Sequence, residues 1–259
     1  MLVIKTYSRK DFENKPQSAP DVILKELKNN YLNENGTLPF FDVEEVINNE
    51  IDKNNKNAAF HEKIKSFLER YNNCISISND NLATYSCFNA FSSKFDNAGL
   101  VLFDAHPCCM SLKEISAKSH IRALIENKAI NKDNIIFVGL RSWHSDEYKF
   151  LKDSRLKFFG MKEISSESIE EISYSIMSVA KSFNALYASI DIDVIEPVFA
   201  PATNNPEVGG LTSRQLLFLL SKLRMLKNWK FADIVGIAPE KDLNNVTSKL
   251  CAKIISELC

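Results

Sequence analysis

The chain has 259 residues, of which 45% are hydrophobic and 25% are charged, and its formal net charge is −1. This balance gives no electrostatic basis for binding nucleic acid or a membrane surface, and no apolar run approaches the length of a membrane span. A chain of this length can form one large α/β domain, and no shift in composition marks a boundary within residues 1–259.

The six cysteines are scattered along the chain and form no Cys-x-x-Cys pair. In a chain of this length without a recognisable signal peptide, such cysteines are typical of reduced thiols. We therefore expect a cytoplasmic protein without disulfides.

Strands and helices alternate along the sequence. We predict strands at 3–6, 74–78, 99–103, 134–140, 157–161, 185–192 and 231–237. We predict helices at 20–29, 61–71, 82–95, 119–126, 145–154, 166–183, 212–226 and 245–258. Residues 30–56 are rich in Asn, Asp and Glu and predict a loop, a short strand near 38–43 and a weak helix. Apolar strands that alternate with helices indicate a three-layer α/β fold with a mainly parallel sheet of about eight strands.

Polar residues follow several of the predicted strands. In open α/β sheets, sites form outside the carboxyl ends of the strands. The segments at such ends are 79–81, 104–109, 191–196 and 236–239. We expect them to meet in one crevice.

Two of these segments carry acidic residues at a spacing of two. Asp191 and Asp193 close the strand predicted at 185–192, and Asp104 and His106 follow another strand. Residues two apart on a strand point to the same side, and two like charges at a buried strand end resist desolvation unless a cation lies between them. A single Asp-x-Asp is also typical of residues that cap helices or bind water. The two pairs together form an oxygen-rich set that suits Mn²⁺ or a similar cation.

Four blocks of the sequence resemble the ureohydrolase family of arginases, agmatinases and formimidoylglutamases, from about residue 76 to the C-terminus. The stretch SIDIDVIEPVFAPATNNPEVGGLT, residues 189–212, resembles the family block SxDxDxxDPxxAPGTGxPExGGLT. DAHPC at 104–108 resembles DAHxD, SNDNL at 78–82 resembles GGDHS, and VGIAP at 235–239 resembles VEVxP. His120 resembles the family's histidine that follows the second block. The resemblance implies an arginase-like fold.

In that family two Mn²⁺ ions share a hydroxide that attacks a guanidinium or formimino carbon. The resemblance implies that Asp104, His106, Asp191 and Asp193 bind one of the two metals and that His120 is catalytic. It also implies a small guanidino or amidine compound as the substrate and a homo-oligomeric assembly.

The other metal position departs from the family pattern. That metal should share Asp104 and Asp191 and add a histidine and an aspartate, but this chain has Asn81 and Cys108 there. An amide oxygen is a weak neutral ligand, and a soft sulfur replaces a hard oxygen, so Mn²⁺ would be held poorly in that half of the site. The glutamate that binds substrate in the family falls on Gly236, which has no carboxylate.

Two hypotheses follow. In the first, the chain has lost the two-metal chemistry, holds at most one Mn²⁺ and binds a ligand or partner. In the second, it is an active C–N hydrolase that uses one metal or a site containing Cys108. The first is favoured because two metal ligands and the substrate carboxylate are lost together.

Several side chains keep more than one interpretation. Cys108 fits a thiolate ligand of Zn²⁺, a nucleophile or an inert buried thiol. His120 begins a predicted helix, where a surface or capping histidine is also common. Arg141, Trp143 and His144 follow a strand end and either line the crevice or form a surface loop.

Overall fold

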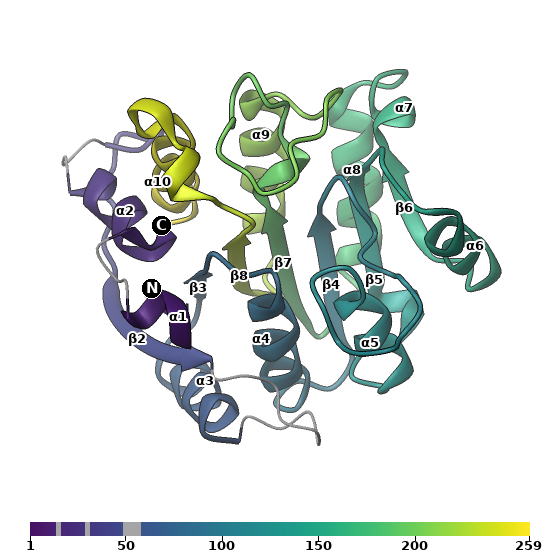
Figure 1. Cartoon of the computed structure of the whole chain (residues 1–259), viewed down its shortest axis with the longest axis horizontal. Helices are drawn as coiled ribbons and strands as arrows, with labels where there is room; N and C mark the ends of the chain where they lie inside the picture. The colour runs from purple at the N-terminus through teal and green to yellow at the C-terminus, as the bar shows by residue number, and fades with distance from the viewer. Residues whose placement is uncertain (14–16, 29–31, 49–57) are drawn as a thin grey trace.

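Eight parallel strands form one sheet in the computed structural model of the chain, which describes residues 1–13, 17–28, 32–48 and 58–259 (Figure 1). Their order across the sheet is β2-β1-β3-β8-β7-β4-β5-β6. The strands are β1 (Leu2–Ser8), β2 (Asp42–Asn48), β3 (Cys74–Ile77), β4 (Ala98–Phe103), β5 (Ile135–Leu140), β6 (Lys157–Gly160), β7 (Ala185–Asp191) and β8 (Trp229–Val235). The predicted parallel sheet of about eight strands is confirmed.

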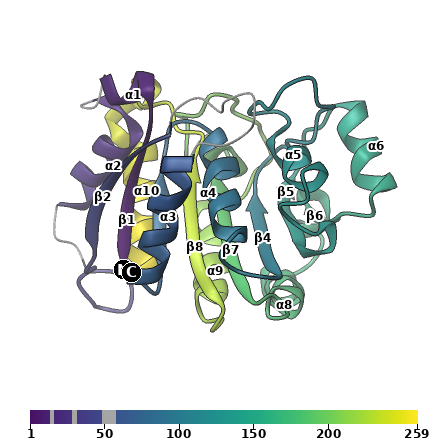
Figure 2. The same cartoon turned by 90° about the horizontal axis from the view of Figure 1, so that it is seen from below.

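Helices cover both faces of the sheet and complete the predicted three layers (Figures 1 and 2). One face carries α2 (Ala19–Leu27), α8 (Ile169–Ala180), α9 (Ser213–Arg224) and α10 (Val246–Leu258). The other carries α3 (Ala58–Arg70), α4 (Leu82–Ser92) and α5 (His120–Glu126), with α6 (Ser145–Asp153) beyond them toward β6. Two short helices, α1 (Arg9–Glu13) and α7 (Met161–Ile164), complete the set. Thr212 caps the N-terminus of α9, because its side chain accepts a hydrogen bond from the backbone N–H of Gln215.

The core forms two apolar layers, one on each face of the sheet. In β7, Leu186, Ala188 and Ile190 pack against one helical layer. Ala185 and Tyr187 of the same strand pack against the other layer. Successive side chains of a strand point to opposite faces, so a strand covered on both sides is apolar throughout.

Three local predictions differ from the structure. The strand predicted near 38–43 is β2, which begins at Asp42 and contains two glutamates. Pairing with β1, together with an ion pair between Lys5 and Glu45, overrides the weak strand propensity of these residues. Helix α1 was not predicted, and the helix predicted at 166–183 is shorter, with α7 before it. The end of the helix predicted at 20–29, and parts of the 30–56 prediction, lie outside the described residues.

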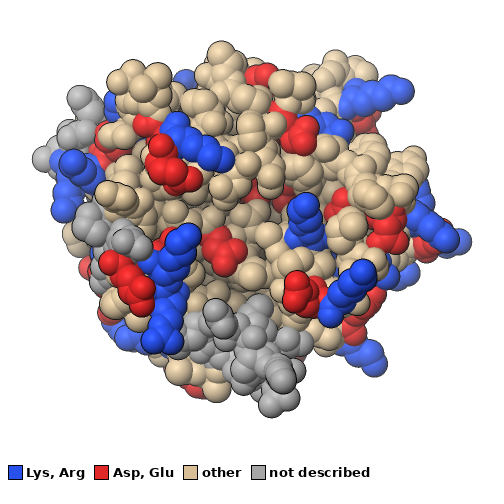
Figure 3. All heavy atoms as spheres, viewed as in Figure 1, with Lys and Arg blue, Asp and Glu red and all other residues tan. Residues whose placement is uncertain are grey.

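Charged side chains are interspersed on the face seen in Figure 3, where lysine and arginine alternate with aspartate and glutamate. Among the helices that the structure describes, none is both long enough and apolar enough to cross a bilayer.

Candidate functional site

A cavity of about 620 Å³ opens at the carboxyl ends of the central strands, and we call it the central cavity. All four predicted metal ligands and both substituted metal positions line it. The lining residues are Asn79, Asp80, Asn81, Asp104, His106, Cys108, Met110, Ala117, Lys118, Ser142, Trp143, His144, Glu147, Asp191, Asp193, Asn204, Asn205 and Glu207. Three of the four segments predicted to form a crevice, 79–81, 104–109 and 191–196, therefore meet in the central cavity together with Trp143 and His144, whereas 236–239 is not among the described residues that line it.

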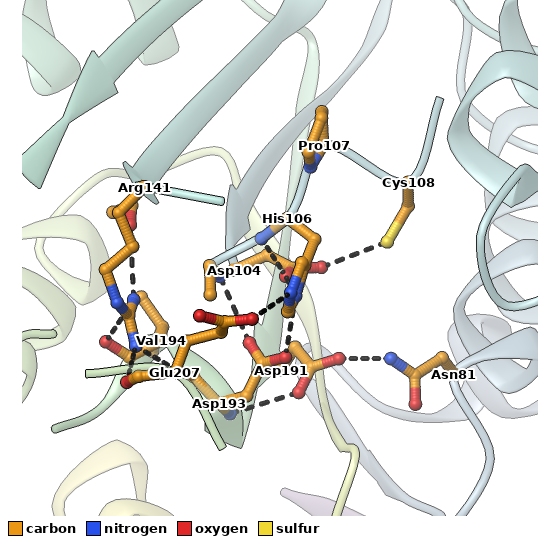
Figure 4. A network of polar contacts seen from close by, with 12 residues as sticks. Asn81, Asp104, His106, Pro107, Cys108, Arg141, Asp191, Asp193, Val194 and Glu207 are labelled. Carbon is orange, nitrogen blue, oxygen red and sulfur yellow. Dashed lines mark hydrogen bonds and ion pairs between the residues drawn. The ribbon is translucent and has the colours of Figure 1, made fainter. Parts of the chain in front are cut away.

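Asp104, His106 and Asp193 form a compact group whose ligand atoms all lie within 4.8 Å of one another (Figure 4). Asp104 and His106 follow β4, and Asp193 lies in a short 3-10 turn after β7. The Nδ1 of His106 lies 2.9 Å from Asp193 Oδ2 and 3.6 Å from Asp104 Oδ1. The backbone N–H of Ala105 donates to Asp193 Oδ1 at 3.1 Å, which ties the two strand ends together.

The electrostatics of this group favour one positive charge at its centre. Burial raises the pKa of Asp104 to about 7, and the charge of Asp193 adds to this shift. Burial alone would lower the pKa of His106, but hydrogen bonds and charge from Asp104 and Asp193 raise it to about 11. Asp104 and Asp193 thus stabilise a positive charge on His106. The same two carboxylates would also stabilise a single metal cation.

Asp191 is oriented differently from the other three predicted ligands. Its Oδ1 accepts a hydrogen bond from the backbone N–H of Asp193 at 3.1 Å, and its Oδ2 accepts one from the Asn81 amide. Burial, followed by the charges of Asp193 and Asp104, raises the pKa of Asp191 well above its ordinary value. Both oxygens of Asp191 are thus engaged, and one of them is held by a substituted metal position.

Gly236 lies directly against Asp191. A Cβ atom at position 236 would be 2.1 Å from Asp191 Oδ1, and the φ of Gly236 is +80°. The sequence presents Gly236 as a position that has lost a substrate-binding carboxylate. In the structure, the carboxylate of Asp191 fills the space where such a side chain would begin.

Cys108, the second substituted position, donates a hydrogen bond from its thiol to Asp104 Oδ2 at 3.3 Å. The residue is 6% exposed and has a left-handed φ of 52°, a conformation that costs a non-glycine residue about 1 kcal/mol or more. Burial raises the pKa of the Cys108 thiol well above its ordinary value, and the neighbouring aspartates raise it further. A protonated buried sulfur is a poor nucleophile, which argues against the nucleophile interpretation.

His120, predicted to be catalytic, lies at the start of α5 and is 1% exposed. Its Nδ1 is 2.9 Å from the carbonyl oxygen of Ala117, and burial lowers its pKa to about 4. Ala117 and Lys118 line the central cavity, whereas His120 does not belong to the described residues that line it. Its catalytic role stays a prediction, and the surface alternative does not fit its burial.

Glu207 was not singled out from the sequence, although it lies within the long block at 189–212. Its Oε1 is 3.3 Å from His106 Nε2, on the opposite side of the ring from Asp193 (Figure 4). Arg141 does not line the central cavity but holds the segment that carries Glu207, as its guanidinium donates to the Glu207 carbonyl at 2.6 Å. The only signal for Glu207 in the sequence is its place in the PExGG part of the block.

The Arginase family model matches residues 8–259 of this chain. The chain belongs to the arginase family. An arginase of Staphylococcus aureus (strain MRSA252) is 24% identical over 212 residues, which cover 75% of this chain and 70% of that protein. An agmatinase of Bacillus subtilis (strain 168) is 29% identical over 201 residues, which cover 76% of this chain and 66% of that protein.

Solved structures of the family share the fold. An arginase from Bacillus subtilis superimposes with a TM-score of 0.81 at 19% identity, covering 100% of this chain and 98% of that one. A formimidoylglutamase from Bacillus subtilis has a TM-score of 0.86 at 19% identity, covering 99% of this chain and 85% of that one. At these identities the likeness establishes the arginase-like fold alone.

The two halves of the site present different groups to a metal ion. Asp104, His106 and Asp193 converge with two carboxylates and an imidazole, a donor set typical of Mn²⁺ and related ions. At the second position, Asn81 and Cys108 present hydrogen-bond donors to the carboxylates instead of ligand atoms to an ion.

Proposed function

We propose that this member of the arginase family has lost the two-metal hydrolysis of guanidino and amidine C–N bonds and binds at most one divalent ion per chain. Asp104, His106 and Asp193 would hold that ion, and the family resemblance implies Mn²⁺. The protein would then use the central cavity to bind a ligand.

The hydrogen bonds made by Asn81 and Cys108 carry this proposal. Each donor points at a carboxylate that the second metal would have to share, Asp191 for the amide and Asp104 for the thiol. A second ion would have to break both hydrogen bonds, and the amide and sulfur that remained would be weak ligands for a hard cation. Two neutral donors stabilise the carboxylates without a second ion.

The lining of the central cavity favours a small cationic ligand. Six carboxylate side chains face it, and Lys118 is the one lysine or arginine among the described residues that line it. The carboxylates belong to Asp80, Asp104, Glu147, Asp191, Asp193 and Glu207. A guanidino or amidine compound has the positive charge that such a surface stabilises.

A second candidate is an active hydrolase with a single metal. Its support is the intact group of Asp104, His106 and Asp193 beside an open cavity large enough for a small substrate. A mixed site in which the Cys108 thiolate binds Zn²⁺ is a variant of this candidate, since Cys108 already contacts Asp104.

Activity assays separate the two candidates. The purified protein would be incubated with arginine, agmatine, formimidoylglutamate or guanidinobutyrate, in the presence of Mn²⁺ or Zn²⁺, and urea or formamide would be measured. We expect release no faster than without protein. Metal-dependent turnover at about 1 s⁻¹ or faster, a rate typical of enzymes, would favour the hydrolase.

A further inference from the structure

The two ring nitrogens of His106 face different partners. Nδ1 faces the carboxylates of Asp104 and Asp193, where the ligand atoms converge, and Nε2 faces Glu207 Oε1 at 3.3 Å (Figure 4). A neutral imidazole carries a proton on only one nitrogen. If Nε2 donates its proton to Glu207, the lone pair of Nδ1 is left to bind a cation. A carboxylate on the far nitrogen of a ligating histidine fixes both the tautomer and the orientation of the ring.

Arg141 fixes the segment that carries Glu207. Its Nη2 donates to the carbonyl oxygens of Glu207 at 2.6 Å and of Asp193 at 2.7 Å, and its Nε donates to Val208 at 3.0 Å. The planar guanidinium thus joins the backbone of one ligand of the metal group to the backbone of Glu207. A lysine, with one nitrogen, could not make these contacts together.

A second anchor, Glu196, holds the two residues that follow Val208. Glu196 Oε2 accepts hydrogen bonds from the backbone N–H groups of Gly209 at 2.6 Å and Gly210 at 2.8 Å. A Cβ atom at Gly210 would lie 2.6 Å from the backbone nitrogen of Glu196, so the two segments pack too closely for a side chain there. The backbone is therefore held at Glu207 itself and at the three residues that follow it.

We infer that Glu207 is a positioning residue of the metal site: it orients His106 through Nε2, and Arg141 holds it in place. This inference rests on the proposed function, because it requires an ion at Asp104, His106 and Asp193. Glu207 acts on the ion through the imidazole.

Four variants distinguish two effects of Glu207 on metal binding, namely the orientation of His106 and the negative charge of the carboxylate. Glu207→Ala removes both the charge and the acceptor, whereas Glu207→Gln removes the charge and keeps an acceptor oxygen. Arg141→Lys keeps its charge and loses the bridge to Glu207 and Asp193. Glu240→Gln is the matched control, since Glu240 is exposed and is not among the residues that line the central cavity.

Mn²⁺ affinity is measured by titration calorimetry, and His106 is followed by NMR of ¹⁵N-histidine with Zn²⁺ as a diamagnetic substitute. Only four histidines are present, so the ring signals can be assigned by substitution. We expect Glu207→Ala to weaken Mn²⁺ binding about 10- to 100-fold, the usual effect of losing such a partner, and to shift the Nε2 signal. Glu207→Gln should lose less affinity, Arg141→Lys should weaken binding, and Glu240→Gln should match the wild type.

Equal weakening in Glu207→Gln and Glu207→Ala, with an unchanged Nε2 signal, would assign the effect to charge and overturn the inference. Wild-type affinity in Glu207→Ala would also overturn it, while leaving the one-metal proposal in place. If the wild-type protein binds no ion, both the proposed metal site and this inference are overturned. If Glu207→Ala does not fold, the inference is tested instead by the Nε2 signal of Glu207→Gln and by the Mn²⁺ affinity of Arg141→Lys.

Discussion

The carboxylate of Asp191 lies so close to Gly236 that a Cβ atom there would be 2.1 Å from Asp191 Oδ1. The absence of a side chain at position 236 therefore has a local consequence, besides the missing substrate-binding carboxylate that the family resemblance implies there. It makes room for Asp191, which is turned toward Asn81. Positions 81 and 236 are thus linked through the same carboxylate.

Gly236→Ala should destabilise the protein more than a glycine substitution that causes strain alone. Gly36 is the control, because its φ is +73° and nothing lies within 4 Å of a Cβ placed there. We expect Gly36→Ala to lower the free energy of unfolding by about 1 kcal/mol, from backbone strain. Gly236→Ala must also displace Asp191, which should cost a further 1–3 kcal/mol or so. Urea denaturation of both variants checks this, and equal losses would mean that Asp191 moves away without cost.

Restoring ligands at the second metal position should increase metal binding. Asn81→His with Cys108→Asp replaces two hydrogen-bond donors by two metal ligands next to Asp191 and Asp104, and the Mn²⁺ stoichiometry should rise toward two. If calorimetry detects no second binding event, residues other than those at positions 81 and 108 must also prevent the second ion from binding.

Adding Gly236→Glu to that double variant is the step that the sequence alone suggests for regaining urea release. The structure predicts the opposite effect, because the new side chain would push against Asp191, a shared ligand. We expect the triple variant to bind less Mn²⁺ than the double variant and to release no urea. Urea release by the triple variant would show that Asp191 can make room for the glutamate.

His120 should make stability depend on acid pH. Because burial lowers its folded-state pKa to about 4 from 6.5, the unfolded chain binds the proton more readily between these values. The contribution of the neutral imidazole is complete above pH 6.5 and is lost as the pH falls toward 4, by up to about 1.4 kcal/mol per pH unit. His120→Asn keeps a donor for Ala117 and does not titrate. The difference in unfolding free energy between variant and wild type should therefore change by about 3 kcal/mol in total from pH 7 to pH 4. A difference independent of pH would contradict the buried neutral state.

The fold could be predicted from local sequence patterns because its central strands are buried on both faces. The apolar run of β5 and the mostly apolar run of β7 predict buried strands, and the Asp-x-Asp spacing at the end of β7 places two acidic residues at the site. Strand β2 was misplaced because its glutamates are accommodated by pairing with β1, a contact remote in the sequence.

The sequence predicted which residues belong to the site, but not how their side chains are oriented or which of them are in contact. Which way Asp191 turns depends on Asn81 and Gly236, which lie on other strand ends. The contact of Glu207 with His106 depends on Arg141, from yet another strand end. These contacts join segments that are far apart in the chain. Residue spacing within one segment therefore cannot predict them.

The number of Mn²⁺ ions bound per chain decides whether the second metal position can still hold an ion. The purified protein would be equilibrated with excess Mn²⁺, freed of unbound ions, and its metal-to-chain ratio measured by mass spectrometry, with Asp193→Ala as the control for the predicted site. We predict at most one Mn²⁺ per wild-type chain and a clear loss in Asp193→Ala. Two tightly bound Mn²⁺ ions per wild-type chain would show that Asn81 and Cys108 do not prevent the second ion from binding, and would contradict the account.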